Sequence, residues 1–288
     1  MEIVLDVVLD ALLDSVKLLP FLFLTYLFME FLEHNAGDKT RAALTRAGRV
    51  GPLVGASLGL LPQCGFSAAA AGLYAGRVVT VGALLAVFLA TSDEMLPVFI
   101  GEGVSPRVIL TVLGCKFVIA LLVGFAADLI VRRRPEEQGM VDLCQQEHCH
   151  CEKGILRSAL HHTLHIFLFV LIINLALGAT FAAVGEERVA ALMNGVPVLG
   201  ECVAALVGLV PNCAASVAIA TLYVRGVISA GAMLAGLLTG AGAGLLILFR
   251  TNRHHLRENL LIVLALFVAG VAFGSLFDLT GLAGLLYI

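Results

Sequence analysis

Charged residues are scarce in this chain of 288 residues: Asp, Glu, Lys and Arg together make up 14% of it. Soluble globular domains carry roughly a quarter charged residues, so the composition excludes an ordinary soluble domain. Apolar residues make up 60% of the chain, and its mean hydropathy is +1.00. A bilayer core about 30 Å thick requires about 20 apolar residues of helix. Six stretches meet this requirement and predict an all-α integral membrane protein: 15–33, 78–100, 108–131, 158–184, 227–249 and 259–280.

Other missing features exclude further classes of protein. The formal net charge of −3 does not suggest a nucleic-acid partner, and seven cysteines in a chain of this length do not make a disulfide framework. The first residues carry acids and no basic region, so they are not a secretory signal peptide. The sequence contains no P-loop to bind ATP, no HExxH and no nucleophile–base arrangement. We therefore expect no enzyme and no required cofactor.

The chain repeats itself at an offset of 149 residues. Pro62–Leu89 and Pro211–Leu238 share 13 identities in 28 positions, including matched Pro, Cys, Ser and Tyr. In each copy a short apolar run (50–61; 199–210) precedes P-[QN]-C, and a second short run follows it (65–76; 214–224). A helix of 12 residues covers about 18 Å, which is too short to cross a membrane. Because proline breaks a helix, each copy is predicted to form a re-entrant hairpin or two very short spans.

The distribution of basic residues predicts the topology. Of the 18 Lys and Arg, 13 fall in 39–49, at Arg77, in 132–157 and in 250–257. Cytoplasmic loops are enriched in basic residues, and all four places reach the cytoplasm only if the segment 50–76 returns to its own side. Each half then has three spans and one hairpin, so we predict two inverted-topology repeats, an architecture typical of secondary transporters. We expect a first repeat over 1–131, a cytoplasmic Cys/His-rich loop over 132–154 and a second repeat over 155–288.

The two hairpin tips are predicted to form the substrate site. Paired interrupted segments of inverted repeats usually lie at the binding site. Thiolates select soft or borderline ions such as Zn, Cd, Cu(I) and trivalent arsenic. A buried cysteine can equally be a small apolar residue. The candidate substrate-binding residues at the tips are Gln63, Cys64, Ser67, Asn212, Cys213 and Ser216.

Polar residues inside the spans are further candidates. Asp93 and Glu94 are adjacent acids in a predicted span, and intramembrane carboxylates are by default functional. The alternative is that they have no such function and lie where the span leaves the membrane at the outer interface. Lys116 in the next span is a candidate partner for them, whereas the second copy carries glycines and no acid. Asn174 is a weaker candidate, because asparagine often only bonds neighbouring helices.

Cysteines and histidines cluster in the central loop and directly after it. Three thiols and two imidazoles within eight residues could bind zinc or another soft ion in a mobile collecting or sensing loop, although a solvated linker would carry no such role. In the span that follows, two histidines four residues apart share one helix face, with His162 beside them, and could relay ions or protons. The candidate metal ligands are Cys144, His148, Cys149, His150, Cys151, His161 and His165.

With these residues in view, the chain resembles the bacterial family of ten-transmembrane heavy-metal exporters, also labelled arsenic efflux proteins or manganese transporters. The resemblance rests on "DALLDSVKLLPFLFLTYLFMEFLEH", "LLPQCGFSAAAAGLYAGR", "FLATSDEMLP", the Cys/His-rich loop, "HHTLHIFLF" and "LVPNCAASVAIATLY". The P-x-C element also looks like that of organoarsenical efflux permeases, which carry more cysteines at the tip. The resemblance implies a substrate class, a soft or transition metal(loid) ion, and not one particular ion.

Together these features predict a gradient-driven efflux permease in a bacterial or archaeal cytoplasmic membrane. Its expected partners are membrane lipid and the metal ion that it carries, and homo-oligomer formation is left open. The alternative is a transporter or flippase of a small organic or lipid-linked anion, with the loop as a metal sensor. In that case helix ends and the arginines after each hairpin, Arg77 and Arg225, would bind the anion.

Overall fold

The computed structural model describes residues 50–92, 95–131, 155–184 and 198–280, together with most positions between 8 and 27. Every regular element in the described part is a helix. Four of its helical segments are long and apolar enough to cross a membrane by length and composition: Val81–Gly101, Pro106–Val131, Ala230–Thr251 and Arg253–Leu279. The predicted α-helical, multi-pass membrane protein is therefore supported by the structure.

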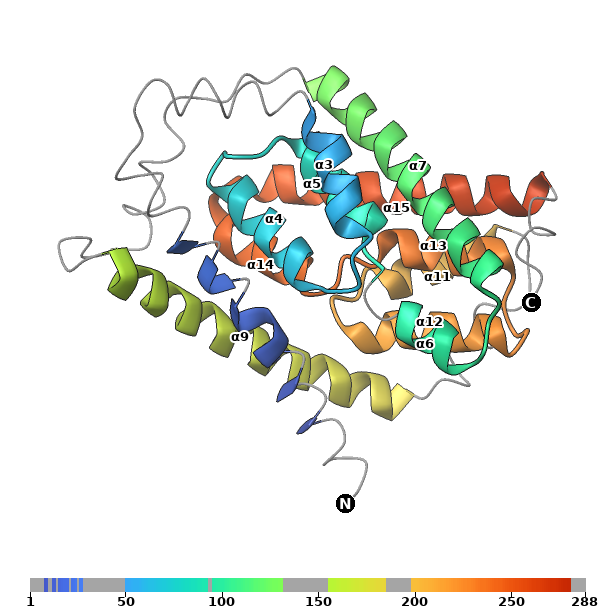
Figure 1. Cartoon of the computed structure of the whole chain (residues 1–288), viewed down its shortest axis with the longest axis horizontal. Helices are drawn as coiled ribbons and strands as arrows, with labels where there is room; N and C mark the ends of the chain where they lie inside the picture. The colour runs from blue at the N-terminus through green and yellow to red at the C-terminus, as the bar shows by residue number, and fades with distance from the viewer. Residues whose placement is uncertain are drawn as a thin grey trace.

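The predicted hairpins consist of short helices on both sides of each proline. In the first copy α3 (Gly51–Gly59) ends before Pro62, and α4 (Gly65–Ala75) begins after Cys64. In the second copy α11 (Leu199–Gly208) and α12 (Cys213–Val224) flank Pro211 in the same way (Figure 1). The prediction that helix breaks lie at the two P-[QN]-C tips is confirmed.

The two stretches predicted as full spans after the hairpins are interrupted. Residues 78–100 form α5 (Val81–Ala90) and α6 (Met95–Gly101), and the helix stops at Ala90. Residues 227–249 form α13 (Ala230–Thr239) and α14 (Ala243–Thr251), with φ 53° at Gly242 between them. A positive φ cannot continue a right-handed helix, which explains the second break. The continuous helices are α7 (Pro106–Val131), α9 (Ile155–Val184) and α15 (Leu256–Leu279), the last following the short turn η3 (Arg253–His255).

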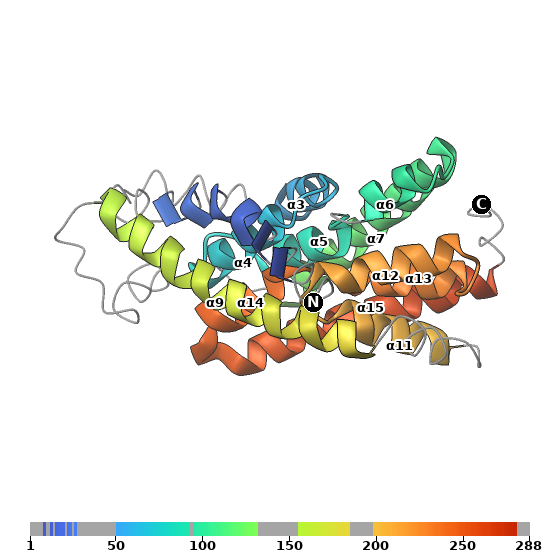
Figure 2. The same cartoon turned by 90° about the horizontal axis from the view of Figure 1, so that it is seen from below.

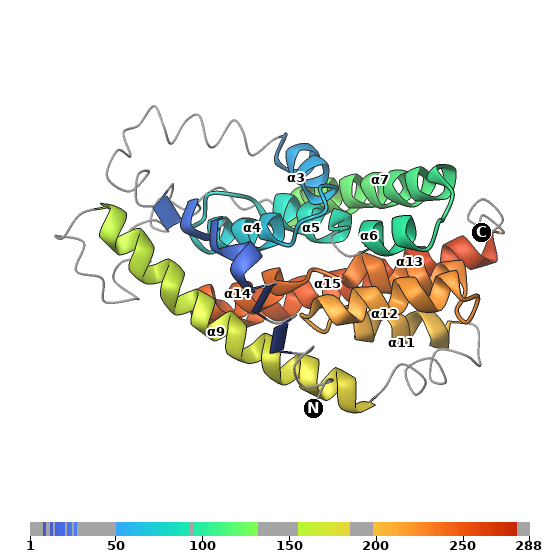
Figure 3. The same cartoon turned by 60° about the horizontal axis from the view of Figure 1, so that its bottom comes forward.

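Helices from the two halves of the chain pack against each other in corresponding pairs. The hairpin helix α4 packs on α14 of the second half, and the hairpin helix α12 packs on α6 of the first half. The half-helices α5 and α13 also touch. Figure 3 shows α3–α7 in one layer and α11–α15 in another, with the long α9 running obliquely beside α14 and α12. Figure 2 shows the same arrangement from below.

A repeated aspartate contact fixes α5 against α7 and α13 against α15. Asp128 Oδ1 accepts from Gly82 N at 2.8 Å, and Asp278 Oδ1 accepts from Gly231 N at 2.7 Å. A carboxylate is favourable there, because the first amides of a helix lack partners and carry partial positive charge. A Cβ at Gly82 or at Gly231 would come within 2.4 Å of a backbone carbonyl of the facing helix, so only glycine allows this approach.

Candidate functional site

Both hairpin tips approach the same turn, Gly240–Gly244, which covers the break between α13 and α14 and the first two residues of α14. A Cβ built on Gly244 would lie 2.9 Å from Cβ of Ser67, in the first turn of α4. A Cβ built on Gly240 would lie 3.1 Å from Oγ of Ser216, in the first turn of α12. The two serines occupy matching positions of the repeat and are both buried. The structure therefore brings one predicted residue from each tip to opposite ends of one glycine-rich turn.

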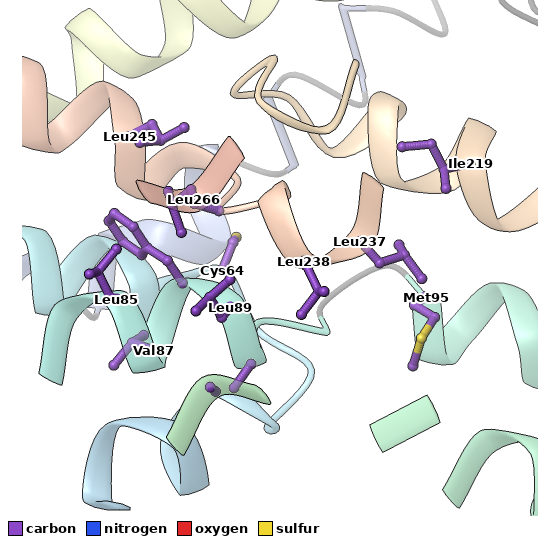
Figure 4. Packing of buried hydrophobic residues seen from close by; sticks show 14 of the residues in the cluster. Cys64, Leu85, Val87, Leu89, Met95, Ile219, Leu237, Leu238, Leu245 and Leu266 are labelled. Atoms are coloured by element: carbon purple, nitrogen blue, oxygen red, sulfur yellow. The ribbon is translucent and has the colours of Figure 1, made fainter. Parts of the chain in front are cut away.

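The first tip is packed into the apolar interior. Cys64 precedes α4, is 5% exposed, and belongs to the main buried cluster, where Figure 4 shows it near Leu89 of α5. Ser67 Oγ donates to the Cys64 carbonyl at 2.7 Å, which closes the first turn of α4. Gln63, by contrast, is only half-buried. The Cys64 thiol thus lies within the protein and is screened from its surface.

The second tip is more open and contacts α9. Asn212 Oδ1 accepts from Ala214 N at 2.8 Å and caps α12, while its Nδ2 donates to the backbone carbonyl of Asn174 at 3.3 Å. Both ends of the Asn212 amide therefore serve to hold α12 against α9. Cys213, the first residue of α12, is half-buried and not in a disulfide. Its exposure makes it the more accessible of the two tip thiols.

The buried side chain of Asn174 makes it a stronger candidate ligand than the sequence alone indicates. Its side chain is 6% exposed, and its Oδ1 has no hydrogen-bond partner among the residues that the structure describes. An unsatisfied buried amide oxygen costs about 1–3 kcal/mol, so a native protein that retains one has a reason for it, such as a water or an ion. Asn174 is thus a candidate ligand at the second tip that the sequence pattern alone ranked low.

Lys116 lies at the point where the half-helices α5 and α13 meet. It is fully buried, and its Nζ donates to the carbonyl oxygens of Thr91 and Leu237, the latter at 2.8 Å. Thr91 is the C-cap of α5, and Leu237 is in the last turn of α13. Its predicted partners, Asp93 and Glu94, lie outside the described residues. No spacing in the sequence could have indicated the two acceptors, because both are backbone carbonyls.

The other predicted metal ligands are not brought to the tips by the described part of the chain. Cys144, His148, Cys149, His150 and Cys151 lie outside it. His161 is in α9 without a described side chain, and His165 is exposed on that helix. No group of three or more His, Cys, Asp and Glu side chains that could hold a metal ion occurs within the described residues. The relay and the collecting loop therefore stay predictions.

Comparison with known proteins gives the family. A family model described as "Putative, 10TM heavy-metal exporter" matches residues 1–195, which is about two thirds of the chain. Comparison of this chain with the curated proteins and with the solved structures finds no match. The matched region includes the first tip, the interrupted α5 and α6, Lys116 and the Cys/His-rich loop. The resemblance carried by the sequence motifs is thereby confirmed: the chain belongs to the family of ten-transmembrane heavy-metal exporters.

Proposed function

We propose that the chain is a gradient-driven permease that exports a soft or transition metal(loid) ion across a bacterial or archaeal cytoplasmic membrane. The ion would bind where the two hairpin tips meet the Gly240–Gly244 turn. The single observation that carries this proposal is the convergence of Ser67 and Ser216 on that turn. Binding sites of transporters with broken helices lie at such meeting points, because unwound backbone is tolerated there only when it is buried or lines a cavity.

The pairing of helices supports an inverted-topology repeat. The contact of α4 with α14 corresponds, after the repeat offset, to the contact of α12 with α6. Two halves related by a pseudo-two-fold axis produce such reciprocal contacts. In this proposal the halves are oppositely oriented in the bilayer, and the cytoplasmic side carries the basic loops.

The chemistry of the tips favours a thiophilic ion. Cys64 and Cys213 occupy equivalent positions next to the first turns of α4 and α12. Thiols bind soft and borderline ions, and the amide oxygen of Asn174 would add a ligand that is acceptable to borderline ions. The difference in exposure between the two thiols suggests an order: the ion meets Cys213 first and Cys64 later.

The experiment is export measured with and without the tip thiols. Cells that lack their own exporters would express the wild-type chain, Cys64→Ala, Cys213→Ala or the control Cys202→Ala, whose half-buried thiol lies on α11. Tolerance to Zn, Cd, Co, Mn and arsenite, and uptake of the same ions by everted vesicles, would be compared. We expect both tip variants to lose export of one ion while Cys202→Ala retains it. Wild-type export by both tip variants would refute tip binding.

An anion transporter or flippase is the second candidate function. It would use Arg77 and Arg225 at the ends of the hairpins. The Arg77 guanidinium, however, already donates to Glu258 at 2.9 Å, so this arginine is engaged within the protein. Transport of an organic anion without transport of any metal in the same vesicles would favour this alternative.

A further inference from the structure

A fully buried lysine joins the two interrupted helices. Lys116 is 0% exposed in α7, and the acceptors among its partners include the carbonyl oxygens of Thr91 and Leu237. One acceptor belongs to the first half of the chain and one to the second. In Figure 4, Leu89 at the end of α5 and Leu238 at the end of α13 lie in the same packed region. The ammonium group therefore occupies the crossing of the two broken helices.

The helix break leaves the Leu237 carbonyl without its helical partner. In a continuous helix this oxygen would accept from the amide of Ala241. Here the amide of Ala241 donates instead to Thr239 O at 2.9 Å, as the chain turns out of α13. Thr91 is likewise past the last helical residue of α5 and has an extended ψ of 123°. Both acceptors are carbonyls that the interruptions have made available.

The electrostatics of the crossing call for a cation. The C-terminus of a helix carries a partial negative charge of about half an elementary charge. Two such ends brought together repel each other in a medium of low dielectric constant unless a positive charge lies between them. A buried ammonium is itself costly unless it is bound by oxygen acceptors. The crossing and the lysine therefore each compensate the cost of the other.

The described part of the second half contains no lysine equivalent to Lys116. The position equivalent to Lys116 on α15 is Leu266, which is also 0% exposed and purely apolar. Leu266 lies 150 residues after Lys116, which is also the separation between the equivalent residues Asp128 of α7 and Asp278 of α15. One lysine from the first half thus serves the helix ends of both halves.

We infer that the crossing of α5 and α13 is a cation-binding site that includes the backbone carbonyls of Thr91 and Leu237, and that Lys116 is its built-in occupant in place of a hard monovalent cation such as Na⁺ or K⁺. Carbonyl oxygens select hard cations, whereas the thiols of the tips select soft ones. The crossing is therefore distinct from the cargo site. The inference rests on the proposed function in one respect, namely that the chain is an exporter with broken helices. Such an exporter needs no bound alkali ion to hold these helices together, because Lys116 supplies the charge.

The test removes the charge of the Lys116 side chain and supplies Na⁺ or K⁺ in solution instead. Full-length Lys116→Met, Lys116→Gln and Lys116→Arg would be purified in detergent beside the wild type and Leu266→Ala, which removes packing at the equivalent position. Thermal midpoints would be measured in NaCl, KCl and choline chloride at equal ionic strength. Choline is too large to enter the crossing, so it controls for ionic strength.

We expect Lys116→Met and Lys116→Gln to be less stable than the wild type in choline and to recover in NaCl or KCl. The recovery should be about 3–5 °C when the ion is at ten times its dissociation constant. The wild type and Lys116→Arg should have the same midpoint in all three salts, and Leu266→Ala should be lowered equally in all three. Equal loss in every salt, or failure of both uncharged variants to fold in any salt, would overturn the inference. The midpoints involve no cargo ion, so a failed export assay would refute the proposed function and leave this result standing.

Discussion

The guanidinium of Arg77 lies 2.9 Å from the carboxylate of Glu258, which ties the end of the first hairpin to the start of α15. The hydroxyl of Tyr74 donates to the same oxygen at 3.2 Å, and the guanidinium is 5.5 Å from the centre of the Tyr74 ring. Arg77 holds φ 58°, a left-handed conformation that costs a non-glycine residue free energy. Its equivalent in the second copy is Gly226, with φ 69°. The first copy thus accepts a strained residue where the second uses glycine, and it gains an ion pair between the two halves.

A double-mutant cycle on this pair should show coupling. Glu258→Gln should lower the free energy of unfolding by about 1 kcal/mol, because both side chains are about one-fifth exposed and the pair is partly screened. Arg77→Gly should be close to neutral, since relief of about 1 kcal/mol of backbone strain offsets the lost pair. In the Arg77→Gly background, Glu258→Gln should cost little. Equal effects of Glu258→Gln in both backgrounds, measured by unfolding in detergent, would contradict the role of the pair.

The aspartate contacts at the starts of α5 and α13 predict a loss of stability from each of two equivalent substitutions. Asp128→Ala and Asp278→Ala each remove the acceptor of an N-terminal amide, and each should cost about 1–2 kcal/mol of unfolding free energy. Asp128 also accepts from the Thr80 hydroxyl at 2.8 Å, so its loss should be the larger of the two. Glu102→Gln, at an exposed position in the turn after α6, is the control and should be neutral. A loss confined to one aspartate would show that the repeat is not energetically equivalent.

Much of the helical organisation follows from the sequence, because its signals are local. Pro62 and Pro211 remove a donor and end a helix wherever they stand, so the hairpin breaks could be predicted. The interruption after Ala90 and the one at Gly240 could not, because an apolar run has the same hydropathy whether or not the helix continues through it. The repeated aspartate contact could not be predicted either, because Gly82 and Gly231 match at an offset of 149 residues whereas Asp128 and Asp278 match at 150.

The candidate site was only partly predictable for a different reason. The matched Ser67 and Ser216 identified the tips, and the structure places both at one turn. The sequence distinguishes the turn itself, Gly240–Gly244, only by its glycines and its lack of acids. Glycine has no side chain, and the sequence alone does not show which neighbouring group packs into the space that this leaves. The partners of Lys116 are backbone carbonyls, which every residue carries, so three-dimensional information was required to find them.

Gly244→Ala tests whether the first tip must lie against the turn. The added methyl group would be 2.8 Å from Phe88 Cε1 and 2.9 Å from both Cβ and the carbonyl oxygen of Ser67. Since a backbone carbonyl cannot move aside cheaply, α4 and α14 would have to separate. We expect this variant to lose most of its metal export. Gly114→Ala is the matched control, because a Cβ there has no atom of the described residues within 4 Å, and it should export normally. Normal export by Gly244→Ala would show that close contact at the turn is not needed.

The two tip thiols should differ in reactivity. Cys213 is half-buried at the start of α12, whereas Cys64 is 5% exposed within the apolar cluster. In variants that retain only one cysteine, a water-soluble thiol reagent should label Cys213 at least several-fold faster than Cys64. Addition of the exported ion should slow the labelling of Cys213. Labelling at equal rates, measured by mass shift of the intact protein, would contradict the order of contacts proposed for the ion.

Asn174→Leu separates a structural role of the second tip from a binding role. The substitution removes a buried amide oxygen that has no partner in the described part of the chain, so it should leave the free energy of unfolding unchanged or raise it by about 1 kcal/mol. The contact that Asn212 makes with α9 uses the backbone carbonyl of Asn174 and is retained. If the amide oxygen binds the passing ion or its water, export should fall although the protein is as stable as the wild type. Leu175→Ala, at an exposed position on the same helix, should leave export intact. A variant Asn174→Leu that is destabilised and exports in proportion to its folded amount would instead make Asn174 a packing residue, because a ligand is defined by loss of binding without loss of fold.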